Sequence, residues 1–397
     1  MSHQSHPVFV SGVGMIPFTK PSATAPYDEM GAAAARMALA DAGLAYEDIQ
    51  QAYVGYVYGD STSGQKALYK VGMTGIPVFN VNNNCSTGST ALFLARQAIA
   101  SGALDCVLVL GFEQMSAGAL GSIFQDRPSP FDAFDEVTDK LVGMPQIPLA
   151  LRYFGGAGLA HMQKYGTPLD AFAKIRAKAS RHAANNPLAL FKQVVTADDV
   201  LNSTMIWPGV MTKLMACPPT CGAAAAVLVS ESFAKSRGLN TSVYIAAQAM
   251  TTDTPATFES DDMMRVVGYD MSKAAAEQVY RQAGLGPEDL DVVELHDCFA
   301  HNELITYEAL GLCPEGGADK FICDGDNTYG GKVVTNPSGG LLSKGHPLGA
   351  TGLAQCFELT HQLRGSAGDR QVAGAQVALQ HNLGLGGACV VTMYRAS

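Results

Sequence analysis

The chain has 397 residues, 47% hydrophobic and only 16% charged, with a formal net charge of −10. At about 150 residues per domain this length predicts two or three domains, and the low charged fraction indicates that part of the surface is buried in an oligomer. No basic stripe dominates the acidic chain, which argues against a nucleic-acid partner. The uncharged stretch 71–95 is too rich in Asn, Pro and Gly to be a membrane span.

The termini and the cysteines bear on the compartment. The first residues, MSHQSHPVFV, contain neither a basic region nor a long apolar run, so no signal peptide is expected. The last residues, YRAS, are not a peroxisomal address. Nine cysteines, an odd number scattered along the chain, favour a reducing environment over a disulfide framework. We therefore expect a cytoplasmic protein.

Three pairs of segments repeat a pattern along the chain. Residues 28–56 and 271–299 each predict an amphipathic helix, a glycine C-cap, a turn and a buried strand. CSTGSTAL, which begins at Cys85, and HPLGATGL, which begins at His346, each predict a glycine-rich turn that enters a helix. GAAAAVLV and GGACVVTM each predict a glycine turn followed by an apolar strand. The repeats predict two similar α/β halves with mainly parallel sheets, related by a pseudo-two-fold axis.

The number of residues between the CSTGSTAL and GAAAAVLV segments of the first half exceeds the number between the corresponding HPLGATGL and GGACVVTM segments of the second half. The added residues predict an inserted subdomain, because a structureless loop of that length would be unusual. We expect the first half at 1–115 and 217–240, the insert at 116–216 and the second half at 241–397. Within the insert, Thr167 followed by Pro168 predicts the capped start of a helix.

Cys85 follows the polar turn VNNN and opens a predicted helix. The partial positive charge and free N–H groups of a helix N-terminus stabilise a thiolate and lower the pKa of a cysteine. They can also hold an oxyanion. The alternative is a small buried cysteine without a chemical role. As a nucleophile, Cys85 would be the cysteine most sensitive to alkylation.

Three histidine-containing segments are further candidates. His346 in SKGHPLGATG is either a base or a turn histidine satisfied by backbone, and the duplication favours the first because it places His346 opposite Cys85. ELHDCFAHNE contains His296, Cys298 and His301. It predicts either a zinc site or an acid/base pair of His296 and Cys298 that face one cleft by strand alternation. His381 begins HNLGLGG, whose glycines allow the backbone to approach a ligand.

These motifs together resemble the thiolase superfamily over essentially the whole chain. NNNCSTGSTAL is similar to the thiolase nucleophile loop and GHPLGATG to its histidine loop. HDCF, with HNLGLGG near the C-terminus, is similar to the subgroup that includes the thiolase domain of sterol carrier protein X. The resemblance implies duplicated α/β/α layers with a helical loop domain inserted in the first half. No sterol-carrier segment follows, which implies a free-standing form.

The resemblance implies CoA-dependent thiolytic cleavage of 3-oxoacyl-CoA, with CoA as substrate and no metal or organic cofactor. Cys85 would attack the 3-keto carbon and His346 would take its proton. His296 and His346 would stabilise the enolate of the departing acyl-CoA, and Cys298 would protonate it and later activate the second CoA. The subgroup favours medium or long acyl chains, including 2-methyl-branched and steroid side-chain substrates.

Two further positions follow from the resemblance. The backbone N–H groups of Cys85 and Leu383 would hold the tetrahedral oxyanion. His381 stands where most thiolases have their second catalytic cysteine, so it would orient its neighbours or supply a proton route.

A homodimer or homotetramer is expected from the low charged fraction and from the oligomeric states usual in the family. The alternatives are a condensing enzyme of the ketoacyl synthase type and a non-catalytic subunit that binds acyl-CoA or lipid.

A basic stretch in the insert is the candidate for holding the phosphates of CoA. Between residues 161 and 193 the chain has six Lys and Arg against one acidic residue. A solvated helix face is the alternative, but the rest of this acidic chain would repel a polyanionic ligand. The expected CoA-binding residues are Lys174, Arg176, Lys178 and Arg181, and the two remaining basic residues are Lys164 and Lys192.

Overall fold

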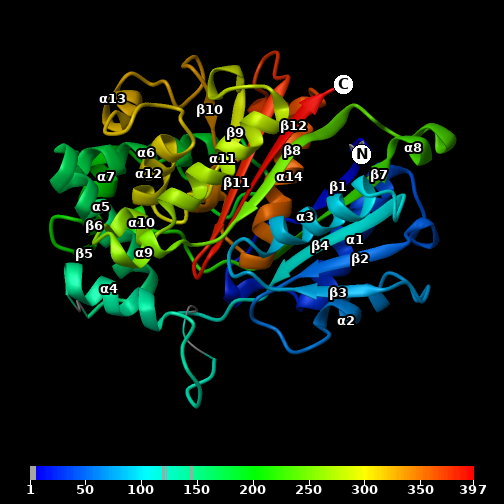
Figure 1. Cartoon of the computed structure of the whole chain (residues 1–397), viewed down its shortest axis with the longest axis horizontal. Helices are drawn as coiled ribbons and strands as arrows, with labels where there is room; N and C mark the ends of the chain where they lie inside the picture. Colours follow the sequence, from blue (N-terminus) through cyan, green and yellow to red (C-terminus); the bar gives the residue numbers. More distant parts are fainter. Residues whose placement is uncertain (1–5, 119–120, 122, 144–145) are drawn as a thin grey trace.

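The computed structural model of the chain describes residues 6–118, 121, 123–143 and 146–397. Within these residues a single sheet of ten strands has the spatial order β10-β9-β11-β12-β8-β1-β7-β4-β2-β3. Its strands are β1 (Val8–Met15), β2 (Gln51–Gly55), β3 (Val78–Val81), β4 (Cys106–Glu113), β7 (Gly222–Ser230), β8 (Val243–Thr251), β9 (Val292–Glu294), β10 (Val334–Thr335), β11 (Val377–Gly384) and β12 (Ala388–Ala396). Strands of the first half and strands of the second half occupy opposite parts of this sheet (Figure 1).

The two halves of the sheet have the same strand pairing. In the first half, β1 and β4 both run antiparallel to β7, and β2 lies parallel between β4 and β3. In the second half, β8 and β11 both run antiparallel to β12, and β9 lies parallel between β11 and β10. A short antiparallel contact between β1 and β8, with Phe9 opposite Tyr244, joins the halves. The predicted duplication is confirmed. The expectation of mainly parallel sheets is wrong, because β7 and β12 each run antiparallel to both of their neighbours.

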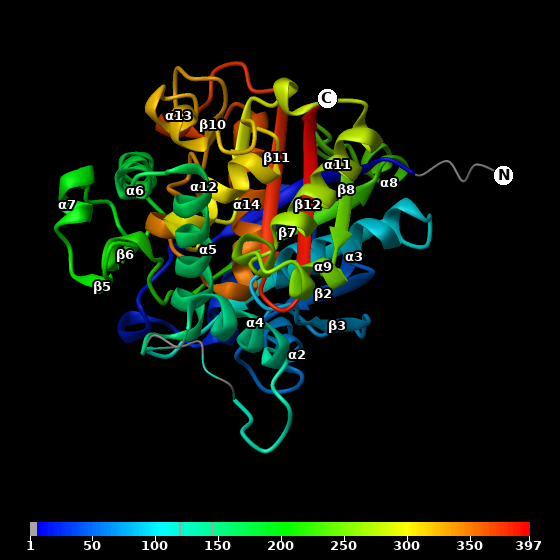
Figure 2. The same cartoon turned by 60° about the vertical axis from the view of Figure 1, so that its left-hand side comes forward.

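The helices form layers on both faces of each half (Figure 2). They are α1 (Tyr27–Ala42), α2 (Ser63–Tyr69), α3 (Thr87–Ala100), α4 (Asp132–Val142), α5 (Leu149–Tyr165), α6 (Leu169–Ala184), α7 (Ala197–Leu201), α8 (Glu231–Arg237), α9 (Pro255–Glu259), α10 (Met263–Val266), α11 (Tyr269–Ala283), α12 (Ala300–Ala309), α13 (Ala318–Cys323) and α14 (Leu348–Leu363). Helices α3 and α14 share one apolar core with strands of both halves, α1 packs on the first half, and α11 and α12 pack on the second. The expected α/β/α layering is confirmed.

The two central helices approach each other closely at their first turns. A Cβ atom added at Gly88 of α3 would lie 2.7 Å from the carbonyl oxygen of Gly349, and one added at Gly352 of α14 would lie 2.4 Å from the backbone nitrogen of Ser89. Such distances leave no room for a side chain. The glycines of the second repeat therefore bring the helix starts of the two halves together, and with them the turns that contain Cys85 and His346.

The stretch expected as an insert is mostly helical. It contains α4 to α7 and a small hairpin of β5 (Met205–Trp207) and β6 (Met211–Thr212). Buried aromatic side chains such as Tyr153 and Phe172 join it to the core around α11 and α12. The limits 1–115, 116–216, 217–240 and 241–397 stay a prediction, and residues 1–5, 119–120, 122 and 144–145 of these segments lie outside the described residues.

One local detail of the insert differs from the expectation. The residue that caps α6 is Pro168, and no side chain caps this end of the helix. The Thr167 hydroxyl instead lies 2.8 Å from Nδ1 of His161, so the prediction that Thr167 caps the helix is wrong. A buried histidine partner took the hydroxyl that the sequence pattern assigned to the backbone. Among the described residues, no helix combines the length and the apolar character needed to cross a bilayer.

Candidate active site

Cys85 lies in the tight turn between β3 and α3, one residue before the cap of α3. Asn84 before it has a positive φ of 50°, and its side-chain amide donates to the carbonyl of Leu385, 3.2 Å away. The end of β11 passes just as close, because a Cβ atom at Gly384 would lie 2.2 Å from the carbonyl oxygen of Asn83. The glycine turn near the C-terminus therefore packs directly on the turn that presents Cys85.

Two histidines from the second half meet Cys85. Its sulfur and one ring nitrogen each of His296 and His346 all lie within 4.8 Å of one another. The two rings are 4.9 Å apart between centroids and nearly perpendicular, at 82°. All three side chains are buried. In the described part of the chain this is the one cluster whose geometry could accept a metal ion, and its sulfur and nitrogen donors suit zinc.

The tautomer of His346 follows from its hydrogen bonds. The Thr351 hydroxyl donates to the carbonyl of Pro347, 2.9 Å away, and so has no proton left for the histidine. Nδ1 of His346, 2.7 Å from that hydroxyl oxygen, must therefore be the donor. Nε2 then carries a lone pair, and it is buried with no hydrogen-bond partner among the described residues. Burial, with the nearby Lys344, lowers the pKa of His346 to about 3, so the ring is a neutral base.

The electrostatics of Cys85 contradict the expected low pKa. Burial, with Glu113 adding to it, raises the pKa of the Cys85 thiol to about 12. The backbone N–H of Cys85 itself acts in the opposite direction and is outweighed. The resting side chain is therefore a thiol. As a nucleophile, Cys85 would therefore need a base to take its proton, and His346 is the neutral base in the same cluster.

Cys298 follows β9 and is buried beside the same site. Its pKa is raised well above the ordinary value by burial first, with Cys217 and Cys85 next. The backbone N–H of Cys217 donates to the carbonyl of Cys298, 2.9 Å away, so these cysteines are neighbours across a short antiparallel bridge. The CPPTC motif that contains Cys217 thus contacts the HDCF segment, and no pattern in the sequence predicted this contact.

His381 contacts the backbone of His296, which fits the expectation that it orients its neighbours, and its role in the reaction stays a prediction. Its ring faces α11, where Nε2 lies 3.0 Å from the Ser272 hydroxyl and Nδ1 accepts from the backbone N–H of His296 at 3.4 Å. The next residue in β11, Asn382, faces the site, because successive strand residues point to opposite sides of a sheet. Its amide nitrogen lies 3.1 Å from the carbonyl oxygen of Cys85 and 3.1 Å from Nδ1 of His296. This alternation is the sequence signal that could have identified Asn382.

Two other predicted groups are placed as follows. Leu383 is buried in β11, adjacent to Asn382 and opposite Cys389 in the β11–β12 ladder, and its role as an oxyanion donor stays a prediction. His301 points away from the site, with Nε2 2.8 Å from the carbonyl oxygen of Val210. The zinc interpretation that grouped His301 with His296 is therefore wrong, because the His301 ring stacks on Phe172 with centroids 4.2 Å apart and is not part of the cluster around His296.

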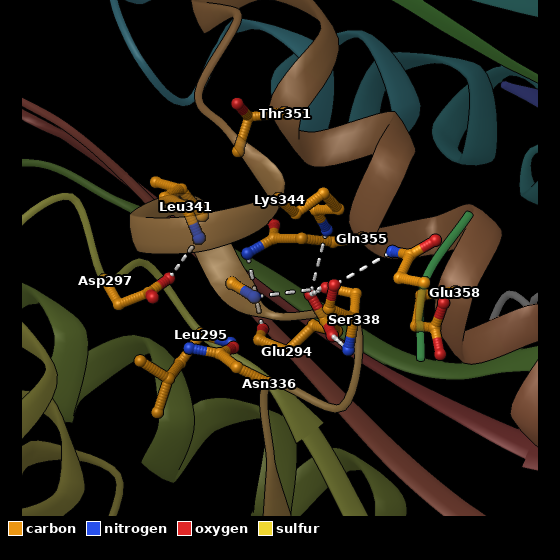
Figure 3. Close-up of polar contacts among 12 residues, drawn as sticks. Glu294, Leu295, Asp297, Asn336, Ser338, Leu341, Lys344, Thr351, Gln355 and Glu358 are labelled. Carbon is orange, nitrogen blue, oxygen red and sulfur yellow. Dashed lines mark hydrogen bonds and ion pairs between the residues drawn. The ribbon is translucent and has the colours of Figure 1, made fainter. Parts of the chain in front are cut away.

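Two buried acids on either side of His296 hold the turn that precedes His346 (Figure 3). Glu294 accepts hydrogen bonds from the backbone N–H and hydroxyl of Ser338, at 3.0 and 2.8 Å, and from Nζ of Lys344 at 3.2 Å. Asp297 accepts from the backbone N–H of Leu341 at 2.7 Å. Burial raises the pKa of Asp297 to about 8, with Glu303 as the next cause. The two histidine-bearing segments are thus fixed to each other.

A third buried acid connects the two halves. Glu113, at the end of β4, accepts from the backbone N–H groups of Val57, Tyr58 and Gly349, at 2.9 to 3.1 Å. Burial raises its pKa to about 7, and the hydrogen bonds from these backbone groups oppose the rise. Gly349 lies in the first turn of α14, so this carboxyl group anchors the helix start that follows His346.

The basic residues of α6 do not form one surface. Lys178 is buried, paired with Glu303 and 3.0 Å from the Tyr307 hydroxyl. Arg176 is buried and donates to the Ser343 hydroxyl at 2.5 Å. The interpretation of these two as groups that hold CoA phosphates is wrong, because both have partners inside the protein. Lys174, paired with Asp170, is only half-buried.

Lys174, Lys178 and Arg181 line an open cavity of about 420 Å³ between α6, the start of α7 and α13, although the ammonium group of Lys178 is paired with Glu303. Arg181 is exposed and forms no ion pair with any described residue. Lys164 pairs with Glu315, and Lys192 is exposed. None of the residues around Cys85 lines this cavity. Lys174 and Arg181 stay candidates for a contact with CoA.

Comparisons with known proteins agree with this geometry. Residues 8–132 match the family model of the thiolase N-terminal domain, and residues 250–394 match that of the thiolase C-terminal domain. The chain is 56% identical to sterol carrier protein 2 of Oryctolagus cuniculus over 98% of its own length and 72% of that protein.

Two solved structures show the same fold. The Ltp2-ChsH2(DUF35) aldolase superposes with a TM-score of 0.81 at 22% identity, covering 99% of this chain and 98% of the other. Human mitochondrial 3-ketoacyl-CoA thiolase superposes with a TM-score of 0.74 at 18% identity, covering 99% of each chain. By its sequence the chain belongs to the thiolase family.

Proposed function

We propose that the chain catalyses thiolytic cleavage of a 3-oxoacyl-CoA by coenzyme A, and the reverse condensation, through an acyl group held on Cys85. The observation that carries this proposal is the free Nε2 of a neutral His346 in the cluster with the Cys85 thiol. A buried thiol and a buried neutral base form a pair that is uncharged at rest and becomes reactive by transfer of one proton. Family membership supports the same reaction class.

In the first step the Cys85 sulfur attacks the 3-keto carbon and its proton moves to Nε2 of His346. The backbone N–H groups of Cys85 and Leu383 hold the tetrahedral oxyanion. The carbon–carbon bond then breaks, which leaves an acyl group on Cys85 and an enolate of the departing acyl-CoA. The N–H groups of His296 and the newly protonated His346 donate to the thioester oxygen of this enolate.

The second half of the reaction uses the other thiol. Cys298 protonates the enolate carbon, and acetyl-CoA or propanoyl-CoA leaves. The resulting Cys298 thiolate takes the proton of the incoming CoA, whose sulfur attacks the acyl carbon. Collapse of that adduct releases the shortened acyl-CoA, and the Cys85 sulfur recovers its proton from His346. The atoms balance without a metal or an organic cofactor, and CoA acts as substrate.

The substrate class, the assembly and the compartment belong to the same proposal. The resemblance of the HDCF motif to its subgroup favours medium or long 3-oxoacyl chains, with 2-methyl-branched and steroid side-chain substrates included, and the identity to sterol carrier protein 2 agrees with that subgroup. We propose a homodimer or homotetramer, supported by a charged fraction of 16%, and a cytoplasmic location, supported by nine cysteines without a disulfide among them. Lys174 and Arg181 steer the CoA phosphates, so the KM for CoA rises with ionic strength.

The test is loss of 3-oxoacyl-CoA absorbance on addition of CoA, with 3-oxohexadecanoyl-CoA and its 2-methyl analogue compared and products identified by mass. Wild type shortens the substrate by one acetyl or propanoyl unit, and Cys85→Ala does not. Intact substrate after prolonged incubation with wild type and CoA would refute the proposal and favour a non-catalytic acyl-CoA-binding subunit.

One observation favours a second candidate function. The cluster of Cys85 with two histidines is also the set that a condensing enzyme of the ketoacyl synthase type requires. The buried Cys298 beside it argues for a thiolase, because a condensing enzyme has no need of a second thiol. Incubation with malonyl-CoA separates the two functions, since decarboxylation at a rate comparable to thiolysis would support the second.

A further inference from the structure

We infer that a series of directional hydrogen bonds from Gln380 through Ser89 to Asn382 fixes His296 as the Nε2–H tautomer. Asn382 is then a positioning residue, because it sets which nitrogen of His296 can donate to the substrate. The inference deepens the proposed function, because the enolate of that reaction is what the His296 N–H would receive. Each link of the chain can be assigned a direction from groups that can only accept or only donate.

The first link is the side-chain amide of Gln380 in β11. Its nitrogen lies 2.7 Å from the carbonyl oxygen of Gly352, which can only accept a hydrogen bond. This fixes which atom of the amide is nitrogen. The amide oxygen accepts from the Tyr394 hydroxyl on the other side, in agreement with that assignment. Two acceptors lie near the second hydrogen of the amide nitrogen, and the Ser89 hydroxyl at 2.7 Å is closer than the side-chain oxygen of Gln355 at 3.3 Å, so this hydrogen goes to Ser89.

The second link is Ser89, in the first turn of α3. Its oxygen already accepts from Gln380, so its one proton is available for the amide oxygen of Asn382, 2.8 Å away. The amide nitrogen of Asn382 lies 3.1 Å from the carbonyl oxygen of Cys85, again a group that can only accept. The orientation of Asn382 is therefore fixed twice, once at each end of its amide.

The third link decides the tautomer. The remaining hydrogen of the Asn382 amide nitrogen points at Nδ1 of His296, 3.1 Å away, so Nδ1 has to accept. The ring is neutral, because burial first and His346 next lower its pKa well below the ordinary value. A neutral ring whose Nδ1 accepts has its proton on Nε2.

The two histidines therefore have opposite tautomers. Thr351 accepts from Nδ1 of His346 and leaves Nε2 as an acceptor, whereas Asn382 donates to Nδ1 of His296 and leaves Nε2 as a donor. One ring is prepared to remove the proton of Cys85 and the other to donate to a developing oxyanion before any substrate binds. This series of hydrogen bonds crosses between the two halves of the protein, since Ser89 belongs to the first half and Asn382 to the second.

The direct test is the proton position on His296, read by ¹⁵N NMR of protein with labelled histidine and assigned by the signal that His296→Gln removes. Wild type should show the proton on Nε2. Asn382→Asp replaces the donor to Nδ1 by a carboxylate, so a proton should move onto Nδ1. A wild-type spectrum with the proton on Nδ1 would overturn the inference, as would an unchanged spectrum in Asn382→Asp.

The kinetic test uses Asn382→Ala, with Asn202→Ala as the matched control at an exposed asparagine in α7's C-cap. Loss of the fixed donor should lower kcat for thiolysis on the order of 10²-fold, the range for one oxyanion donor, while the KM stays within a few-fold. Ser89→Ala should give a smaller loss in the same direction. A kcat within threefold of wild type in Asn382→Ala would overturn the inference. If wild type cleaves no 3-oxoacyl-CoA, the proposed function fails while the NMR result still decides the tautomer.

Discussion

Replacing Thr351 with valine removes one hydroxyl group and keeps the shape of the side chain. In the structure that hydroxyl receives Nδ1–H of His346 at 2.7 Å and donates to Pro347. Without this hydroxyl, the buried Nδ1–H of His346 has no hydrogen-bond acceptor. The tautomer that leaves Nε2 unprotonated therefore becomes less stable. The ring can then adopt the other tautomer, whose Nε2–H points at Cys85 and cannot accept its proton.

The magnitude follows from the price of an unpaired buried donor. Such a group costs about 1–3 kcal/mol, and 1.36 kcal/mol corresponds to a factor of ten, so kcat should fall roughly 5- to 150-fold. The measurement is kcat and KM for thiolysis of one 3-oxoacyl-CoA by wild type, Thr351→Val and Thr351→Ser. Serine keeps the hydroxyl and should retain kcat within about threefold. Equal losses in serine and valine variants, or full kcat in Thr351→Val, would refute the argument about the tautomer of His346.

Three further outcomes are expected. Limited iodoacetamide treatment followed by mass mapping should label the exposed Cys323 before Cys85. The reason is that burial raises the pKa of the Cys85 thiol to about 12 and keeps it protonated. If Cys85 were labelled first, it would be a thiolate at rest. Cys298→Ala should still accept an acyl group from a simple acyl-CoA yet lose thiolysis by roughly 10²-fold or more, the range for a lost general acid/base, whereas Cys389→Ala, altered within β12, should keep it; the reverse pattern would exchange their roles. The Glu113 carboxyl has a pKa of about 7 in the folded state against an ordinary 4.5, so the folded state holds this proton more tightly. The free energy of unfolding of wild type relative to Glu113→Gln should therefore fall as pH rises from about 4.5 to 7 and stay constant above. Chemical denaturation across that range checks the sign, and a difference that rises with pH would contradict it.

Repeats in the sequence were sufficient to predict the centre of the molecule. The match between Gly88 and Gly349 was a statement about equivalent positions, and the structure places these two backbones in contact. Close approach of two helix starts needs glycine on both sides, so a motif repeated in both halves had to meet itself at the pseudo-two-fold axis. For the same reason the turns with Cys85 and His346 could be expected to meet.

The orientation of side chains could not be predicted in the same way. His381 and Asn382 are adjacent polar residues in one strand, and only the helices on either face decide which of them points at Cys85. The register of β11 turns His381 toward Ser272 and Asn382 toward Cys85. A pattern of residue types contains the alternation but not its phase.

The count of basic residues could not predict which of them face solvent, because burial is a property of the assembled fold. Lys178 and Arg181 belong to the same helix, yet Lys178 meets Glu303 in the interior while Arg181 faces solvent. The pKa of Cys85 shows the same limit. The helix start after Cys85 was visible in the sequence, but the burial that raises the pKa of its thiol exists only in the folded protein.

The central claim is the acyl group on Cys85, and peptide mass mapping after an acid quench tests it directly. Wild-type protein mixed with 3-oxohexadecanoyl-CoA in the absence of free CoA should release about one acetyl-CoA per site and leave the shortened acyl group on the peptide that contains Cys85, and added CoA should discharge it. An acyl group found on the peptide of Cys217 or Cys298 instead, or steady turnover without any adduct, would contradict the account.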